Sequence, residues 1–272
     1  MKSPSFLLAL FLFIACSSQK RLNKIADSDW DSMSQESFVR WDSKRLASFD
    51  QKDQLIQGCY KGDIEQSLQE YKKRFLKKDE QPYYWLHIGN CYYLKSDLKK
   101  AAFYYRLMLE DAKDPTLKAL TNNNLAVIAL QNRRWDQARE LLKLSAKNHP
   151  DLKVPQFNLA LLYLQFGHQD RAIAILEGKS FKGFKDIDVY HVLAHAYLYK
   201  GNLQKAESYL KLIPQELANR EDIAVTHSLY LIRKGEFKNA GKVIKSRTPA
   251  GIPEAEFAAK EIESIIEKSV EK

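Results

Sequence analysis

A regular spacing of small residues is the feature that most constrains how this chain can fold. With the chain divided at residues 48, 82, 119, 153, 187 and 221, the twentieth position of each segment reads Ser67, Ala101, Ala138, Ala172, Ala206 and Ala240. The eighth position reads Leu55, Gly89, Ala126, Ala160, Ala194 and Ser228. The fifteenth position reads Gly62, Ser96, Arg133, Gly167, Gly201 and Gly235. Every step is 34 residues except one of 37, which predicts a repeat array with a three-residue insertion near residues 111–116.

The positions of these small residues predict a pair of antiparallel helices in each segment. Small side chains at positions 8 and 20 let two helix backbones cross closely. Glycine at position 15 suits the end of the first helix, where the chain needs a left-handed conformation that glycine adopts without strain. No single pair could bury its apolar face alone, so we expect an all-α fold in which the pairs stack.

The clearest segment, WLHIGNCYYLKSDLKKAAFYYRLML from Trp85, resembles the tetratricopeptide repeat (TPR). That family places Trp, Leu, Gly, Tyr, Ala and an aromatic residue at positions 4, 7, 8, 11, 20 and 24. This segment has Trp85, Ile88, Gly89, Tyr92, Ala101 and Tyr105 there. The resemblance implies a right-handed α-solenoid of about six helix pairs over residues 34–252. Residues 253–272, with Phe257, Ile262, Ile265 and Ile266 on one face, are expected to form a C-terminal capping helix.

The N-terminal residues predict export and lipid anchoring. An apolar run from Phe6 to Ala15 follows Lys2 and is shorter than the ~20 residues that span a bilayer, so residues 1–15 are typical of a secretory signal. Phe13-Ile14-Ala15-Cys16 resembles the lipobox of bacterial lipoproteins, which implies lipidation of Cys16. Ser17 after it, by the same resemblance, implies the periplasmic face of the outer membrane. Residues 16–33 are then a lipidated tether, and the alternative is an ordinary cleaved signal peptide.

Charge and cysteines add two expectations. Without residues 1–15 the chain has 42 basic and 34 acidic residues, a net charge of +8. An exported protein does not meet nucleic acid, so this charge suits an acidic partner, an anionic headgroup surface or simply a solvated outer face. Cys59 and Cys91 lie in apolar helical stretches, so two buried thiols are expected, with a Cys59–Cys91 disulfide as the alternative.

The TPR resemblance also implies a concave groove lined by the first helix of each pair. The candidate protein-binding residues are Tyr83, Leu86, Asn90, Tyr93, Asn123, Asn124, Val127, Leu130, Val154, Phe157, Asn158, Leu161, Leu164, His191, His195 and Leu198. Exposed apolar surface of this extent usually marks an interaction site. Such a wall would accept an amphipathic helix, whereas Asn124 and Asn158 could bond the backbone of an extended peptide.

The sequence contains no recognisable catalytic motif. GKS at residues 178–180 has Ile173 where a phosphate-binding loop needs glycine, and neither HExxH nor GxSxG occurs. His191 and His195 share a helix face with Asp188 one turn earlier, but zinc sites generally need three or four protein ligands. We therefore expect no enzyme activity, no metal and no cofactor. The two histidines are expected at the polar edge of the groove, where protonation near pH 6 would weaken client binding.

These features predict a protein-binding scaffold or assembly factor that serves an outer-membrane or envelope complex. Lipoproteins of this size and build resemble the pilotins of type IV pilus systems, which implies a role in the outer-membrane assembly of secretin subunits. They resemble less well the repeat lipoprotein of the outer-membrane β-barrel assembly machine. The alternatives are a structural component of an envelope or gliding-motility complex, and a metal-dependent protein that uses His191 and His195.

Overall fold

The computed structural model describes residues 65–66, 69, 81–249 and 253–270. The signal segment 1–15, the lipidation site Cys16, the tether 16–33, the repeat unit that begins at residue 48, and Cys59 therefore lie outside the described residues. Expectations about them stay predictions.

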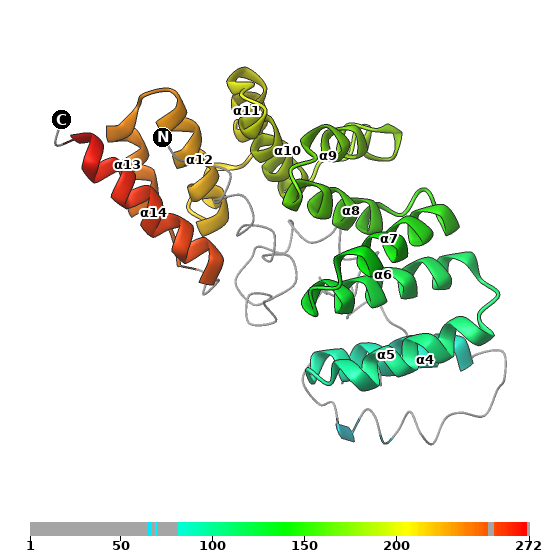
Figure 1. Ribbon diagram of the computed structural model, residues 1–272. Helices are drawn as coiled ribbons and strands as arrows, with labels where there is room; N and C mark the ends of the chain where they lie inside the picture. The colour runs from blue at the N-terminus through cyan, green and yellow to red at the C-terminus, as the bar shows by residue number, and fades with distance from the viewer. Residues whose placement is uncertain (1–64, 67–68, 70–80, 250–252, 271–272) are drawn as a thin grey trace. The chain divides into compact units, whose positions relative to one another are not determined.

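The described residues fold into α-helices that follow one another in pairs (Figure 1). The helices are α4 (Gln81–Leu94), α5 (Leu98–Asp111), α6 (Pro115–Gln131), α7 (Trp135–Asn148), α8 (Lys153–Gln165), α9 (Gln169–Leu176), α10 (Ile187–Tyr199), α11 (Leu203–Leu210), α12 (Glu221–Arg233), α13 (Phe237–Lys245) and α14 (Pro253–Val270). Two 3-10 helices, η7 (Lys179–Phe181) and η8 (Gln215–Leu217), lie in the connections. No residue in the described ranges belongs to a named strand, so the predicted all-α class is confirmed there.

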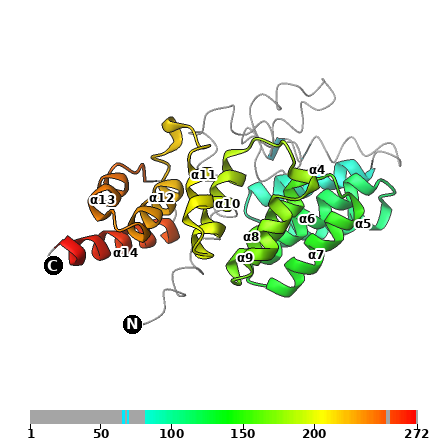
Figure 2. The ribbon, with the colours of Figure 1, turned by 90° about the horizontal axis from the view of Figure 1, so that it is seen from above.

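The helices group into two compact units that divide inside α8, after Leu159. The first described unit contains α4–α7 and the beginning of α8, and the second contains the rest of α8 and α9–α14. Within the second unit, α10 and α11 run side by side, as do α12 and α13 (Figure 2). The sequence predicts one continuous array over residues 34–252, whereas the packing contacts define these two units.

Small residues sit at the helix crossings, as the repeat pattern predicts. At Gly89 on α4, an added Cβ would lie 2.3 Å from Cε1 of Tyr105 on α5, so only glycine allows this approach. The other small residues at positions 8 and 20 are fully buried: Ala101, Ala126, Ala138, Ala160, Ala172, Ala194, Ala206, Ser228 and Ala240. The close crossing of the two helices in each pair therefore depends on these positions.

Position 15 adopts the left-handed conformation in all five described pairs. The φ angles are 63° at Ser96, 56° at Arg133, 75° at Gly167, 77° at Gly201 and 81° at Gly235. In the α10–α11 turn the amide of Asn202 donates to the carbonyl of Tyr197 (2.9 Å) and the amide of Gly201 donates to that of Leu198 (3.1 Å). The same two hydrogen bonds recur in the other turns, so each first helix ends in a Schellman motif even where glycine is absent.

The three-residue insertion lengthens one helix. α6 starts at Pro115, four residues before the repeat frame, and has 17 residues against 13 in α8, α10 and α12. Asp114 caps it by accepting a hydrogen bond from the amide of Thr116 (2.8 Å), and Pro115 suits the first helical position. The insertion thus adds about one turn at the start of α6.

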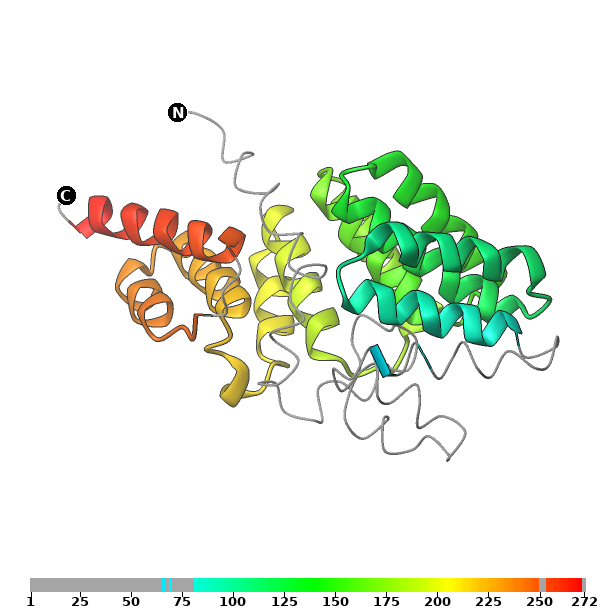
Figure 3. The same cartoon turned by 90° about the horizontal axis from the view of Figure 1, so that it is seen from below.

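α14 covers the apolar side of the last pair (Figure 3). Ala255, Ala258, Ala259 and Ile262 are fully buried, and the last three join Val225 of α12 and Ile244 of α13 in one core cluster. Ile266 also packs against this cluster. Phe257, which the sequence places on the buried face, is 49% exposed instead. The alanines form the contact because their small side chains let α14 approach closely.

A reciprocal exchange tests the turn. Ser96→Gly should raise the free energy of unfolding by about 0.5–1 kcal/mol, because relief of left-handed strain exceeds the extra chain entropy that glycine loses. Gly201→Ser should lower it by about 1 kcal/mol through strain alone, since no atom lies within 4 Å of its added Cβ. Urea unfolding of both variants measures this, and changes of the same sign would contradict a left-handed requirement at position 15.

Candidate functional site

Most of the predicted groove residues are buried in the structure. Leu86, Asn90, Tyr93, Asn123, Asn124, Val127, Val154, Phe157, Leu164, His195 and Leu198 are buried, while Leu130, Asn158, Leu161 and His191 are partly buried. Tyr83 lies on α4, but its side chain falls outside the described part of the chain. These residues come from the first helix of each pair, as predicted. Their use as a wall that binds a partner stays a prediction.

The asparagines of the first unit form a continuous chain of hydrogen bonds across its first helices. Asn158 of α8 donates to Asn123 of α6 (2.8 Å), and Asn123 donates to its neighbour Asn124 (3.3 Å). Asn124 donates to Oδ1 of Asn90 on α4 (3.3 Å), which also accepts the hydroxyl of Tyr105 on α5 (2.8 Å). Four helices are linked by this chain of amides.

This arrangement gives the asparagines an internal role that the sequence did not predict. Buried amides must find partners inside the protein, because an unsatisfied one costs free energy. Asn124 is only 2% exposed and already bonds Asn90. An extended peptide would therefore have to replace a bond within the protein before it could use this side chain. The result favours apolar contacts over an asparagine ladder.

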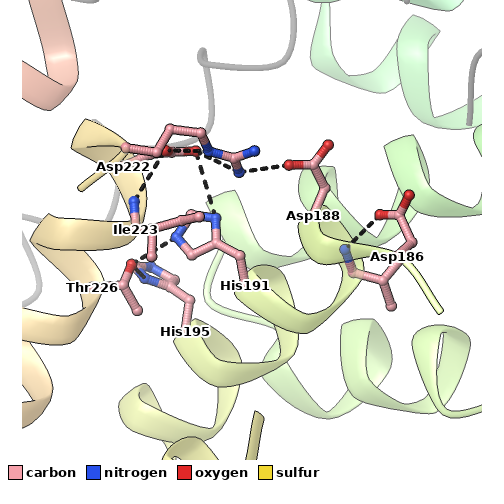
Figure 4. A network of polar contacts seen from close by, with 9 residues as sticks. Asp186, Asp188, His191, His195, Asp222, Ile223 and Thr226 are labelled. Atoms are coloured by element: carbon pink, nitrogen blue, oxygen red, sulfur yellow. Dashed lines mark hydrogen bonds and ion pairs between the residues drawn. The ribbon is translucent and has the colours of Figure 1, made fainter. Parts of the chain in front are cut away.

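The second unit has a different polar network between α10 and α12, and Figure 4 labels Asp188, His191, His195, Asp222 and Thr226 in it. Arg220 lies at its centre. The guanidinium donates to Asp222 through Nε (2.8 Å) and Nη2 (3.1 Å), and Nη2 also donates to Asp188 (2.6 Å). Nε2 of His191 lies 2.8 Å from Oγ1 of Thr226, and Nδ1 of His195 lies 3.4 Å from the same oxygen. His191 also places Nδ1 3.7 Å from Asp222.

Local helix geometry positions this network. Asp186 accepts a hydrogen bond from the amide of Val189 (3.0 Å) and so fixes the start of α10. His191 and His195, four residues apart, then face α12 from the same side of α10, where Figure 4 shows both turned toward Thr226. Arg220 immediately precedes α12, so its side chain can reach back to Asp188.

The charges of the network favour a fixed protonation state. Burial opposes the charge of Arg220, but Asp222 and Asp188 outweigh it and raise the pKa of the guanidinium. Burial likewise opposes the charge of Asp222, but Arg220 and His191 outweigh it and lower the pKa of that carboxyl. The salt-bridged Arg220 and Asp222 therefore stay ionised near neutral pH.

Burial lowers the pKa of both histidines. Burial lowers the pKa of His195 to about 3, with a smaller contribution from His191. Burial also lowers the pKa of His191, although Asp222 opposes that shift. The imidazole of His195 is therefore neutral at pH 6, so the predicted protonation near that pH is wrong for this residue, and for His191 burial acts in the same direction. The reason is that the histidines lie inside the contact between two helices and not at a solvated edge.

The network is not arranged as a metal centre. Asp188, the candidate third ligand, directs a carboxylate oxygen to Arg220. Across the part of the chain that the structure describes, no group of three or more His, Cys, Asp and Glu side chains is placed to hold a metal ion.

Cys91 on α4 is fully buried and disulfide-bonded. The expectation of a free buried thiol at this position is therefore wrong. An apolar helical context is compatible with both states, so periodicity alone could not separate them.

A cation–π contact that the sequence did not predict recurs in three of the helix pairs. The ammonium of Lys100 lies 5.1 Å from the ring centre of Tyr92, Arg171 lies 5.4 Å from Tyr163, and Lys205 lies 5.9 Å from Tyr197. In all three pairs the tyrosine is at position 11 and the cation at position 19. Each contact links the two helices of one pair and contributes roughly 0.5–1 kcal/mol at exposed sites.

Comparison with known proteins agrees with this helix-pair architecture. The family model for the tetratricopeptide repeat matches residues 187–213, which correspond to α10, α11 and the residues just after them. Residues 187–213 are therefore similar to a tetratricopeptide repeat. No curated protein matches the chain in sequence.

Two solved structures share the TPR-like fold. PilF from Pseudomonas aeruginosa is 18% identical with a TM-score of 0.62, and the match covers 77% of this chain and 97% of PilF. BtubC from P. vanneervenii is 16% identical with a TM-score of 0.52, covering 80% of this chain and 93% of BtubC. These likenesses confirm the predicted TPR-like α-solenoid class. Among the described helices, none is both long and apolar enough to cross a membrane.

The depressed histidine pKa predicts acid sensitivity. His195 has a pKa of about 3 when folded and an ordinary value of 6.5, so the folded state binds fewer protons. Its contribution to stability is complete above pH 6.5 and is lost as the pH falls toward 3. Lowering the pH from 6.5 to about 5 should cost about 2 kcal/mol through His195.

His195→Asn keeps a polar atom near Thr226 but removes the titratable imidazole. Urea unfolding at several pH values should therefore show a shallower pH dependence for the variant than for the parent chain. Burial also lowers the pKa of His87 to about 3, so the variant should retain part of the acid sensitivity. An identical pH dependence in both proteins would show that His195 is accessible to protons when folded.

Proposed function

We propose that this protein is a non-enzymatic scaffold that binds a protein partner through the first helices of its TPR-like pairs. The observation that carries this proposal is the TPR match at α10 and α11 within five helix pairs that share the same crossings and turns. Helix-pair repeats of this kind stack to form extended surfaces suited to binding other proteins.

The polar networks support this role by fixing the helices that would contact the partner. The amide chain links α4, α6 and α8 in the first unit, and Arg220 links α10 to α12 in the second. A surface that is rigid before binding loses less entropy when it binds. Apolar residues on the same helices, such as Leu130 and Leu161, would then supply the contact itself.

We further propose that lipidated Cys16 anchors the chain at the periplasmic face of the outer membrane. The support is the lipobox-like Phe13-Ile14-Ala15-Cys16 and the Ser17 that follows it. The disulfide at Cys91 is consistent with export, because disulfides persist in oxidising compartments such as the periplasm. In this location the partner is a subunit of an outer-membrane or envelope complex.

The client that fits best is a secretin subunit, which would make the protein pilotin-like. This proposal rests on the resemblance to pilus-associated lipoproteins of similar size and build. The fold shared with Pseudomonas aeruginosa PilF supports this proposal. A structural role in an envelope or gliding-motility complex is the alternative.

Site-specific photocrosslinking tests the binding surface. A photoreactive phenylalanine analogue at Leu130 or Leu161, both partly buried on first helices, should trap the client in cells. The same analogue at Phe103 (58% exposed) or Leu144 (45% exposed), on second helices, is the matched control and should trap little. Adducts confined to Phe103 and Leu144 would place the partner on the opposite helices and overturn the proposal.

The anchor and the client are tested separately. Cys16→Ser should move the protein from the membrane fraction to the soluble periplasmic fraction, because stable anchoring needs acyl chains on that cysteine. Deletion of the gene should leave secretin as monomers with few multimers on gels that preserve assemblies. If Cys16→Ser makes the protein soluble but the deletion strain still forms normal secretin multimers, the lipid anchor is supported and the secretin is rejected as the client.

A further inference from the structure

The last helix pair carries an unusual concentration of positive charge around α13. Residues 233–247 contain six basic side chains and one acidic one, so about half of the chain's net charge of +9 lies in this segment. The sequence leaves the positive charge open to an acidic partner, an anionic headgroup surface or a solvated outer face. The structure shows which basic side chains of this segment are already in ion pairs.

Three lysines of this segment share one exposed face of α13. Lys238, Lys242 and Lys245 are spaced by four and three residues, which places them on one side of a helix, and all three are exposed. The opposite side holds Ala240 and Ile244, which are fully buried. Because Ile244 belongs to the core cluster with α12 and α14, α13 is held with its lysines toward solvent.

Four carboxylates on α11, on α14 and in the α12–α13 turn pair with other basic side chains, whereas the exposed Glu261 and Glu267 of α14 form no ion pair with the three lysines. Glu236 pairs with Lys234 (2.7 Å), and Glu263 pairs with Arg247 (2.6 Å). Glu256 on α14 pairs with Lys260 (2.7 Å) and Glu207 on α11 with Lys211 (2.8 Å). None of the three lysines has an ion-pair partner among the residues that the structure describes. Their charge is therefore available to an external anion.

We propose that the Lys238–Lys242–Lys245 face of α13 binds the headgroups of anionic phospholipids. Lysine is a compact, strongly hydrated point charge, which suits a diffuse layer of phosphate groups. Binding by this face is peripheral, because the apolar side of α13 is already used inside the protein.

The chemistry of the face favours a lipid surface over an acidic protein. Lysine is depleted in the cores of protein interfaces, which prefer aromatic residues and arginine as anchors. None of the exposed large hydrophobic residues in the described chain lies on α13. The face therefore offers charge without the apolar anchor that a stable protein contact needs. This inference concerns a surface distinct from the first helices and does not depend on the acylation of Cys16.

Vesicle binding by the full chain carrying Cys16→Ser tests the proposal, because this form has no acyl anchor. Cosedimentation is measured with phosphatidylcholine vesicles and with vesicles in which one lipid in three is phosphatidylglycerol. The chain should bind the anionic vesicles selectively and release them as NaCl rises from about 0.1 M to about 0.5 M. Each lysine near an anionic membrane contributes roughly fivefold, so Lys238→Gln/Lys242→Gln/Lys245→Gln should bind about 100-fold more weakly.

The matched control removes three other exposed lysines, Lys179, Lys182 and Lys185, in the α9–α10 connection. This Lys→Gln triple has the same net charge and should change binding by less than about threefold. The triple Lys→Arg variant of α13 should retain binding. Lysine and glutamine have similar helix propensities, and unchanged thermal unfolding confirms that α13 is intact.

Equal losses in the two glutamine triples would show that only net charge matters and would overturn the proposal. Absence of selective binding to anionic vesicles by the parent chain would overturn it as well. Binding of polyglutamate but not of vesicles would identify an acidic protein as the ligand instead. None of these outcomes affects the photocrosslinking test of the first helices, so the two proposals can fail separately.

Discussion

The close crossing of two helices at small side chains is the contact on which the rest of this structure depends. At Gly89 the ring of Tyr105 occupies the space that any side chain would need, and the equivalent alanines in later pairs are fully buried. The crossing brings the second helix back along the first, which requires a sharp reversal between them. The left-handed residue at position 15 provides that reversal, and Ser96 and Arg133 adopt it despite their side chains. The close helix crossing therefore depends on the left-handed turn at position 15.

Once the pairs are formed, polar networks fix how successive first helices meet. The two units use different kinds of side chain for this contact. Uncharged amides link α4, α6 and α8, whereas the partly buried Arg220 with two aspartates and two histidines links α10 to α12. Removing one partner of a buried charged pair is strongly destabilising, often by about 3–5 kcal/mol. The second unit is thus committed to one register between α10 and α12, and that register positions every apolar residue on these helices.

The repeat frame predicted most of the architecture because it rests on local rules. It placed the starts of α8, α10 and α12 within a residue, and it identified the buried alanines and the left-handed turns. The contacts between repeats could not be read in the same way. Asn90 and Asn124 are 34 residues apart in sequence, and nothing in their separate contexts shows that their amides meet. His191 and His195 looked like a metal pair or a solvated edge, because the residues that bury and bond them lie on α12. Burial on α14 also differed from the hydropathy pattern, since alanines and not Phe257 form its contact.

The structure has two kinds of surface, which differ in whether their polar or their apolar side chains are already used inside the protein. On the first helices, amides and carboxylates bond one another and the partly buried Arg220, so the proposed partner would use apolar side chains of these helices. On α13 the apolar side is used by the core cluster, and Lys238, Lys242 and Lys245 form no ion pair with any residue that the structure describes. Apolar contacts are short-ranged and depend on shape, whereas lysine charges act over about a Debye length and tolerate a mobile surface. A chain built this way can be selective for a protein on its first helices and remain near an anionic membrane through the outer face of its last pair.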